Sequence, residues 1–123
     1  MQEEVLKWWK LAERDLDTAE YNFRGNKYYA AAFFCQQAAE KALKALDLKK
    51  SGKIIRTHDL LFLCNRINAP ESITEKCIRI TPVYTESRYA DFSGIKSYTI
   101  SKVKEILSYT REVLKWAKEN LNI

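Results

Sequence analysis

The segment Ala30–Leu46, AAAFFCQQAAEKALKAL, constrains the fold of this chain most, because its first half is small and apolar on nearly every side of a helix. A helix without a polar face must be surrounded by other parts of the protein. Polar residues then appear as a single stripe, made of Gln36, Glu40, Lys44 and Asp47. We therefore predict that this segment is the central helix of a helical bundle.

Composition favours an all-α protein. The chain has 123 residues, which is enough for one hydrophobic core and one domain over residues 1–123. Three Gly and two Pro leave little material for hairpins, and runs typical of strands are missing. Short connections place neighbouring helices antiparallel. The prediction is an up-and-down bundle of four long helices plus one short helix.

Steps of three and four residues between apolar positions locate the long helices. The first is predicted to end at Gly25-Asn26, since both residue types tolerate the left-handed conformation found after helices. The second is predicted over residues 27–50. The last helix has a heptad pattern and takes Thr99 or Ser101 as its N-cap.

The middle of the chain holds the remaining two helices. Thr57 is predicted to cap the short third helix, with Asp59 in its first turn. The fourth helix is predicted to start near Pro70 and to kink or stop at Pro82, which lacks a backbone donor. The periodicity then fails over residues 86–98, which indicates a loop.

The cysteines give no sign of a metal site. Cys35, Cys64 and Cys77 are widely spaced and lie among apolar residues, whereas metal ligands usually come in close pairs with histidine support. Asp15 and Asp17 are two residues apart and diverge on a helix. We expect buried free thiols, no metal and no cofactor.

Charge and hydropathy give weaker indications of surroundings and partners. No apolar run approaches the ~20 residues that cross a bilayer, so we expect a cytoplasmic protein without a membrane partner. The net charge of +5 is compatible with an anionic partner such as nucleic acid. It is also common in proteins that bind nothing acidic, so the two cases stay open.

Three segments together resemble the HEPN domain family of archaea and bacteria. They are the small-residue helix with QQAAEKALKA at residues 36–45, the Thr57-His58-Asp59-Leu60-Leu61 segment, and Tyr84-x-x-x-Arg88-Tyr89-x-Asp91. The resemblance covers nearly the whole chain in order. It implies a helical bundle, often dimeric, that binds a nucleotide or RNA and is often encoded beside a minimal nucleotidyltransferase, in some members as a toxin–antitoxin pair.

Ribonuclease members of that family carry an arginine followed, after four to six residues, by a histidine. The one histidine of this chain, His58, has no arginine at that distance before it, and no histidine follows Arg88 at that distance. RNA cleavage through the 2′-hydroxyl generally needs a proton acceptor and donor, and an arginine does not exchange protons. Because the motif is absent, we assign no catalytic residue. If the chain were instead a divergent ribonuclease, it would use His58 and Arg88.

The candidate ligand-binding residues are Arg88, Tyr89, Asp91 and His58. The first three lie where helical periodicity breaks, and functional residues gather at such places. Arg88 could bind a phosphate, or an Arg–Asp pair could brace the loop. His58 could contact a ligand, or its ring could bond to a neighbouring helix end.

Gln36 and Gln37 are the amides of the central helix. Buried amides need partners, which either a symmetric dimer interface or a polar cleft would supply. Three functions follow: a nucleotide- or nucleic-acid-binding homodimer with a nucleotidyltransferase partner, a divergent ribonuclease toxin, or a purely structural bundle that holds another protein.

Overall fold

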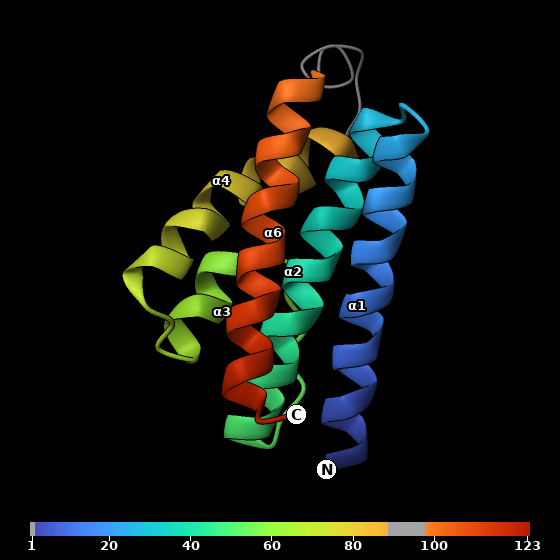
Figure 1. Ribbon diagram of the computed structural model, residues 1–123. Coiled ribbons are helices and arrows are strands. Elements are labelled where there is room, and N and C mark those ends of the chain that lie inside the picture. The colour runs from blue at the N-terminus through green and yellow to red at the C-terminus, as the bar shows by residue number, and fades with distance from the viewer. Residues whose placement is uncertain (1, 89–97) are drawn as a thin grey trace.

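The computed structural model describes residues 2–88 and 98–123, with the backbone alone for residues 82–88. Within these ranges the chain forms five helices and no strand, so the predicted all-α class is confirmed (Figure 1). The bounds of the helices are α1 (Gln2–Arg24), α2 (Tyr28–Ser51), α3 (Leu60–Arg66), α4 (Glu71–Arg88) and α6 (Ile100–Leu121). The four long helices alternate in direction along the chain, and α3 is short, as predicted.

The helix α2 occupies the centre of the bundle and packs against each of the other four helices. Its first half is buried on several sides, with Ala31, Ala32, Cys35, Ala38 and Ala39 all fully enclosed. Small side chains allow neighbouring helices to approach closely from more than one direction. The central position predicted from the apolar segment is confirmed.

Left-handed residues end the first two helices. Asn26, with φ 63°, follows α1 close to the predicted end. Gly52, with φ 75°, follows α2 and donates its N–H to Leu48 O at 2.8 Å. A residue without a Cβ adopts this conformation at little cost, so the chain leaves α2 abruptly and turns back along the bundle.

The third helix begins later than predicted, because its N-cap is Asp59 and not Thr57. The Asp59 carboxylate accepts hydrogen bonds from the N–H groups of Leu61 and Phe62 at 3.0 and 3.1 Å. The Thr57 hydroxyl instead accepts from the N–H of Asp59, at 3.1 Å, and closes a turn before the helix. The acidic side chain satisfies two otherwise unpaired donors, so it defines the helix start.

The fourth helix continues through Pro82 to Arg88, so it does not stop at the proline. A proline removes one backbone hydrogen bond, which a helix can lose without ending. Residues 86–88 are therefore helical, and the prediction that the loop begins at residue 86 was wrong. At the start of α6, Thr99 is the N-cap and accepts from the N–H of Lys102 at 3.2 Å, which confirms one of the two predicted caps.

The three cysteines are free and buried, as predicted. Burial raises the pKa of the Cys35 thiol to about 12, although a hydrogen bond with Thr110 acts in the opposite direction. A hydrogen bond with Cys64, together with burial, also raises the pKa of Cys77. These two thiols therefore stay protonated near neutral pH and pack as small apolar groups.

Neither a membrane span nor a metal cluster is found in the part of the chain that the structure describes. There, each helix is too short or too polar to cross a bilayer. The same residues contain no group of three His, Cys, Asp or Glu side chains that could hold a metal ion.

Candidate functional site

Three of the four residues in the polar stripe of α2 are buried, and the fourth, Lys44, is half-buried. Gln36 is fully enclosed, and Glu40 and Asp47 are only 3% and 2% exposed. A buried carboxylate is costly unless cations or hydrogen-bond donors surround it. The hydrogen-bond partners of these residues therefore indicate whether each one stabilises helix packing or belongs to a site.

Glu40 lies between two nitrogen-bearing side chains. Its Oε1 atom lies 3.0 Å from Nδ1 of His58, and its Oε2 atom accepts from Nζ of Lys44 at 2.8 Å. An ionised carboxylate only accepts hydrogen bonds, so the ring donates from Nδ1. Glu40 thus fixes the orientation of the imidazole and the position of the ammonium group.

A second contact attaches His58 to α2. The amide nitrogen of Gln36 donates to the backbone oxygen of His58 at 3.3 Å. The amide oxygen of Gln36 has no hydrogen-bond partner among the described residues. The bonds of His58 to Gln36 and Glu40 attach the segment that joins α2 to α3 to the side of α2. The Asp59 cap attaches the end of the same segment to the start of α3.

This connecting segment forms one wall of a pocket of about 440 Å³, which we call the His58 pocket. The opposite sides come from α1 and α2. The lining residues are Trp8, Lys44, Ile54, Ile55, Arg56, Thr57 and His58. A volume of this size lies within the range of small-molecule sites.

Cationic and aromatic groups meet in the His58 pocket. Nζ of Lys44 lies 5.5 Å from the centroid of the Trp8 ring, close enough for a cation–π interaction. Arg56 is exposed, and the His58 side chain is 55% exposed. The pocket therefore offers an indole face together with a guanidinium, an ammonium and an imidazole, groups that suit a phosphate next to a planar base.

Two other pockets of similar volume lack this combination. One, of about 480 Å³, is lined by Lys49, Lys50 and Trp116 but by no arginine and no histidine. The other, of about 490 Å³, mixes acidic and basic residues along α1 and α6, so the opposite charges offset each other.

The second buried carboxylate of the stripe belongs to the packing of the bundle. Asp47 accepts from Nε of Arg66 at 2.9 Å and from a second guanidinium nitrogen at 3.4 Å. This pair ties α2 to α3. Lys41 of α2 similarly pairs with Asp15 of α1. Both pairs hold helices together and neither lines the His58 pocket.

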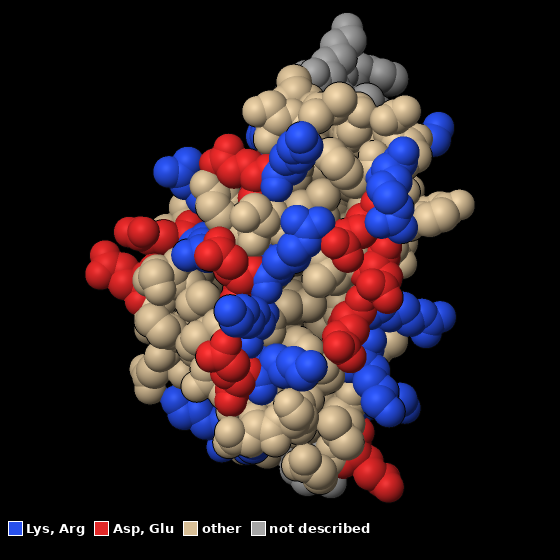
Figure 2. All heavy atoms as spheres, in the orientation of Figure 1, with Lys and Arg blue, Asp and Glu red and all other residues tan. Residues whose placement is uncertain are grey.

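Charge on the face that carries α1 and α6 is mixed. Figure 2 shows lysine and arginine side chains interspersed with aspartate and glutamate over the described residues of this face. A nucleic-acid track would be expected to carry one sign of charge continuously. The net charge of +5 is therefore not gathered on this side.

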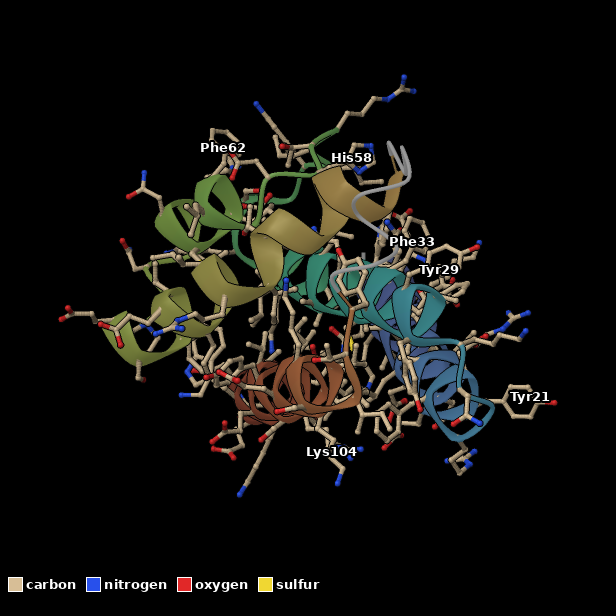
Figure 3. The ribbon with its side chains drawn as sticks, turned by 90° about the horizontal axis from the view of Figure 1, so that it is seen from above. Tyr21, Tyr29, Phe33, His58, Phe62 and Lys104 are labelled. Atoms are coloured by element: carbon tan, nitrogen blue, oxygen red, sulfur yellow. The ribbon has the colours of Figure 1, made fainter. Side chains whose placement is uncertain are left out.

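The structure brings two of the predicted site residues together, His58 and Gln36. Gln37 is half-buried on the same helix. Arg88 is the last residue of α4, but its side chain lies outside the described part, as do Tyr89 and Asp91 entirely. Seen from above, His58 lies on the same side of the bundle as α3 and the C-terminal end of α4 (Figure 3).

Three polar or aromatic residues that line the pocket, Trp8, Lys44 and Arg56, were not predicted as site residues from sequence, and neither was Glu40 behind them. A usable signal was present, because Gln36, Glu40 and Lys44 share one face of an otherwise apolar helix. Arg56 lies two residues before His58 and Trp8 comes from a distant part of the sequence, so neither carries such a signal.

Comparison with known proteins agrees with the fold. The family model described as "HEPN domain" matches residues 5–121. The crystal structure of TT1696 from Thermus thermophilus superposes with a TM-score of 0.86 at 27% identity, over 94% of this chain and 97% of that one. ST0689, an archaeal HEPN homologue, gives a TM-score of 0.79 at 35% identity, over 94% and 95% of the two chains. No curated protein matches the sequence.

Proposed function

The chain belongs to the HEPN domain family, and we propose that it is a module that binds a nucleotide or RNA phosphate in the His58 pocket. In this proposal it acts as a homodimer together with a nucleotidyltransferase-type protein, as in a toxin–antitoxin pair. The ligand contacts include the predicted residues His58, Arg88, Tyr89 and Asp91, with Arg56, Lys44 and Trp8 added from the pocket.

One observation carries the binding proposal. A buried carboxylate, Glu40, holds an ammonium and an imidazole at the edge of a pocket that also contains an exposed guanidinium and an indole ring. A structural ion pair would need only one cation to neutralise Glu40. The further donors around the same space favour an anionic ligand, and the Trp8 ring favours a base beside it.

Arg56→Ala tests this proposal with little risk to the fold, because Arg56 is exposed. We expect the affinity for ATP and for a labelled oligoadenylate to fall about tenfold, the loss expected for one partly solvated charge-assisted contact. Lys53→Gln is the matched control, since it removes one positive charge from the same segment but does not line the pocket. Equal affinities of the two variants would contradict the assignment.

The partner protein is a separate part of the proposal, and it rests on the family resemblance. Purification of the tagged protein from its native host should recover a small nucleotidyltransferase. Recovery of that protein with no affinity for ATP or RNA in either component would favour the purely structural role instead.

A divergent ribonuclease is the second candidate function, and the Glu40–His58 contact favours it. A carboxylate at Nδ1 orients an imidazole for proton transfer, as in general-base sites. Arg88 would then neutralise the phosphate. Highly purified protein should cleave RNA, and His58→Ala should abolish the cleavage; an absence of cleavage across a set of single-stranded RNAs would exclude this candidate.

A further inference from the structure

We propose that two copies of this chain associate through the face formed by α1 and α6, with an acidic band on α1 of each copy lying against a basic band on α6 of the other. The acidic band is Glu13, Asp17 and Glu20, and the basic band is Arg111, Lys115 and Lys118. This inference rests on the homodimer of the proposed function and names its interface.

The mixed charges of this face are ordered along the two helices. Members of each band are three or four residues apart in sequence, so they share one side of their helix. All are exposed except Glu20, which is half-buried. Over the described residues, Figure 2 shows a column of basic side chains on α6 beside a column of acidic side chains on α1.

A groove of about 490 Å³ lies between the bands and is lined by members of both. At one end of the groove the bands are joined, because two guanidinium nitrogens of Arg111 donate to Oε2 of Glu20 at 2.7 and 3.0 Å. The other four charged groups of the bands make no ion pair within the described part of their own chain. Their charges can therefore be compensated by a second molecule.

The two bands match in height. The helices α1 and α6 run in opposite directions (Figure 1), and the Glu20–Arg111 pair fixes their register. The last member of each band, Glu13 or Lys118, lies seven residues from this pair. At about 1.5 Å per residue, corresponding members of the two bands agree in height within about 1.5 Å. Each acid is thus level with a base on the neighbouring helix.

This arrangement is self-complementary in one orientation of two copies. A two-fold axis parallel to the helices places α1 of one copy opposite α6 of the other and leaves every residue at its own height. Each acidic band then faces a basic band. A two-fold axis across the helices would place α1 against α1 and α6 against α6, and the like charges would repel. The charge pattern therefore selects the first orientation.

The flanks of the face continue the same alternation. Beyond the basic band, Glu105, Glu112 and Glu119 recur every seven residues on α6, and all three are exposed. Beyond the acidic band, α1 carries the exposed Lys10 and Arg14 four residues apart. Across the face the order is acidic, basic, acidic, basic, so the parallel two-fold axis brings opposite signs together at the flanks as well.

The proposed interface leaves the His58 pocket accessible. Seen from above, His58 lies on the side of the bundle away from α6 (Figure 3). The two pockets of the dimer would therefore face outwards on opposite sides. Single pairs of exposed charges stabilise little, so the association depends on the summed complementarity of the bands and weakens as salt screens it.

Ionic strength gives the first test. Sedimentation velocity of the full chain is measured at about 0.01 M and about 1 M salt, where the screening length falls from about 30 Å to about 3 Å. We expect a dimer of twice 14.4 kDa at the lower concentration, and a dissociation constant about tenfold higher or more at the other. A monomer at both salt concentrations would overturn this inference together with the homodimer of the proposed function.

Charge reversal gives the second test. Glu13→Lys combined with Asp17→Lys makes the acidic band basic, and Lys115→Glu combined with Lys118→Glu makes the basic band acidic. Each double variant alone should be monomeric at low salt, because like charges then face each other. An equimolar mixture of the two should form a dimer with one copy of each, and its absence would overturn this inference. All four positions are exposed, so both variants should fold, which circular dichroism verifies.

Lys50→Glu combined with Lys53→Glu is the matched control. It changes the net charge as much as the reversal on α6, but its positions are exposed at the end of α2 and in the segment after it. It should dimerise like the wild type; a monomer here would show that net charge, and not the bands, governs association. A dimer that neither salt nor the two reversed variants change would overturn this inference alone and place the interface on another face.

Discussion

Oε2 of Glu40 accepts a 2.8 Å hydrogen bond from Nζ of Lys44, one helical turn further along α2. Most pairs at this spacing lie on a helix surface and add little stability. Here the carboxylate is buried, so the ammonium compensates a charge that water does not reach. The same interaction therefore matters for the fold as well as for the pocket.

Removal of the Glu40 carboxylate should destabilise the protein, because Lys44 and His58 both lose their hydrogen-bond partner. We expect Glu40→Ala to lower the free energy of unfolding by about 2–4 kcal/mol, since it leaves an ammonium close to the core without its counter-ion. Urea denaturation measures the effect. The exposed Glu119→Ala on α6 is the control and should change stability by less than about 0.5 kcal/mol; an equally small effect at Glu40 would refute the role of the buried pair.

The assignment of the α3 cap predicts unequal effects at two neighbouring positions. Asp59→Ala should cost about 1 kcal/mol, the usual loss for an N-cap, because two N–H groups lose their acceptor. Thr57→Ala should cost less, since its hydroxyl serves one N–H outside the helix. Thermal or urea unfolding of the two variants measures the two losses of stability. A larger loss for Thr57→Ala than for Asp59→Ala would show that Thr57 is the cap.

The raised pKa of Cys35 predicts a loss of stability in alkaline solution. The thiol ionises near 9.0 in the unfolded chain and at about 12 in the fold. Between these values the unfolded state binds fewer protons than the folded state. The contribution of this thiol to the free energy of unfolding is therefore fully present below pH 9, and it falls as pH rises towards 12, by up to about 1.4 kcal/mol per pH unit. Cys35→Ala should show a shallower decline between pH 9 and 11 in urea denaturation; the same slope in both proteins would contradict the shift.

The predicted role of Arg88 is testable without its side-chain position. Arg88→Ala should weaken binding of a labelled nucleotide or short RNA, because a guanidinium is a strong phosphate ligand. The thermal midpoint should stay nearly unchanged, since the residue ends its helix. A variant that binds as well as the wild type would remove Arg88 from the site.

The apolar surface of a single chain predicts a homodimer. Large apolar residues remain exposed, among them Tyr21 of α1 at 71%, Ile54 of the segment that joins α2 to α3 at 57%, and Phe62 of α3 at 45%. Such groups commonly mark an interface. Light scattering at micromolar concentration should give twice the 14.4 kDa of one chain; a mass of one chain would show that these residues have another role.

The fold was predictable because its signals are local. The period of three to four residues, the small residues of α2 and Thr99 each act within one or two turns of helix. Asp59 and Thr57 show the limit of such signals: both residues are good caps, and only the geometry of the connecting segment determines which hydroxyl or carboxylate reaches the N–H groups of Leu61 and Phe62.

The site was less predictable because its members come from three separate segments. His58 was identified as the one histidine, but its partner Glu40 lies 18 residues earlier and Trp8 lies on another helix. Periodicity gives the face of a helix on which a residue lies and not the segment that covers that face. The stripe of Gln36, Glu40 and Lys44 indicated a polar environment, whereas the fold alone brought Arg56 to it.

The central position of α2 has a consequence for how the molecule comes apart. Every other helix covers part of its surface, so no pair of helices can detach and leave a remainder with an intact core. We infer that the bundle loses its structure in one cooperative step, with the amide hydrogens of α2 exchanging with solvent only through global opening. Any ligand that fastens the connecting segment to α2 would therefore protect the whole chain from proteolysis, and not the pocket alone.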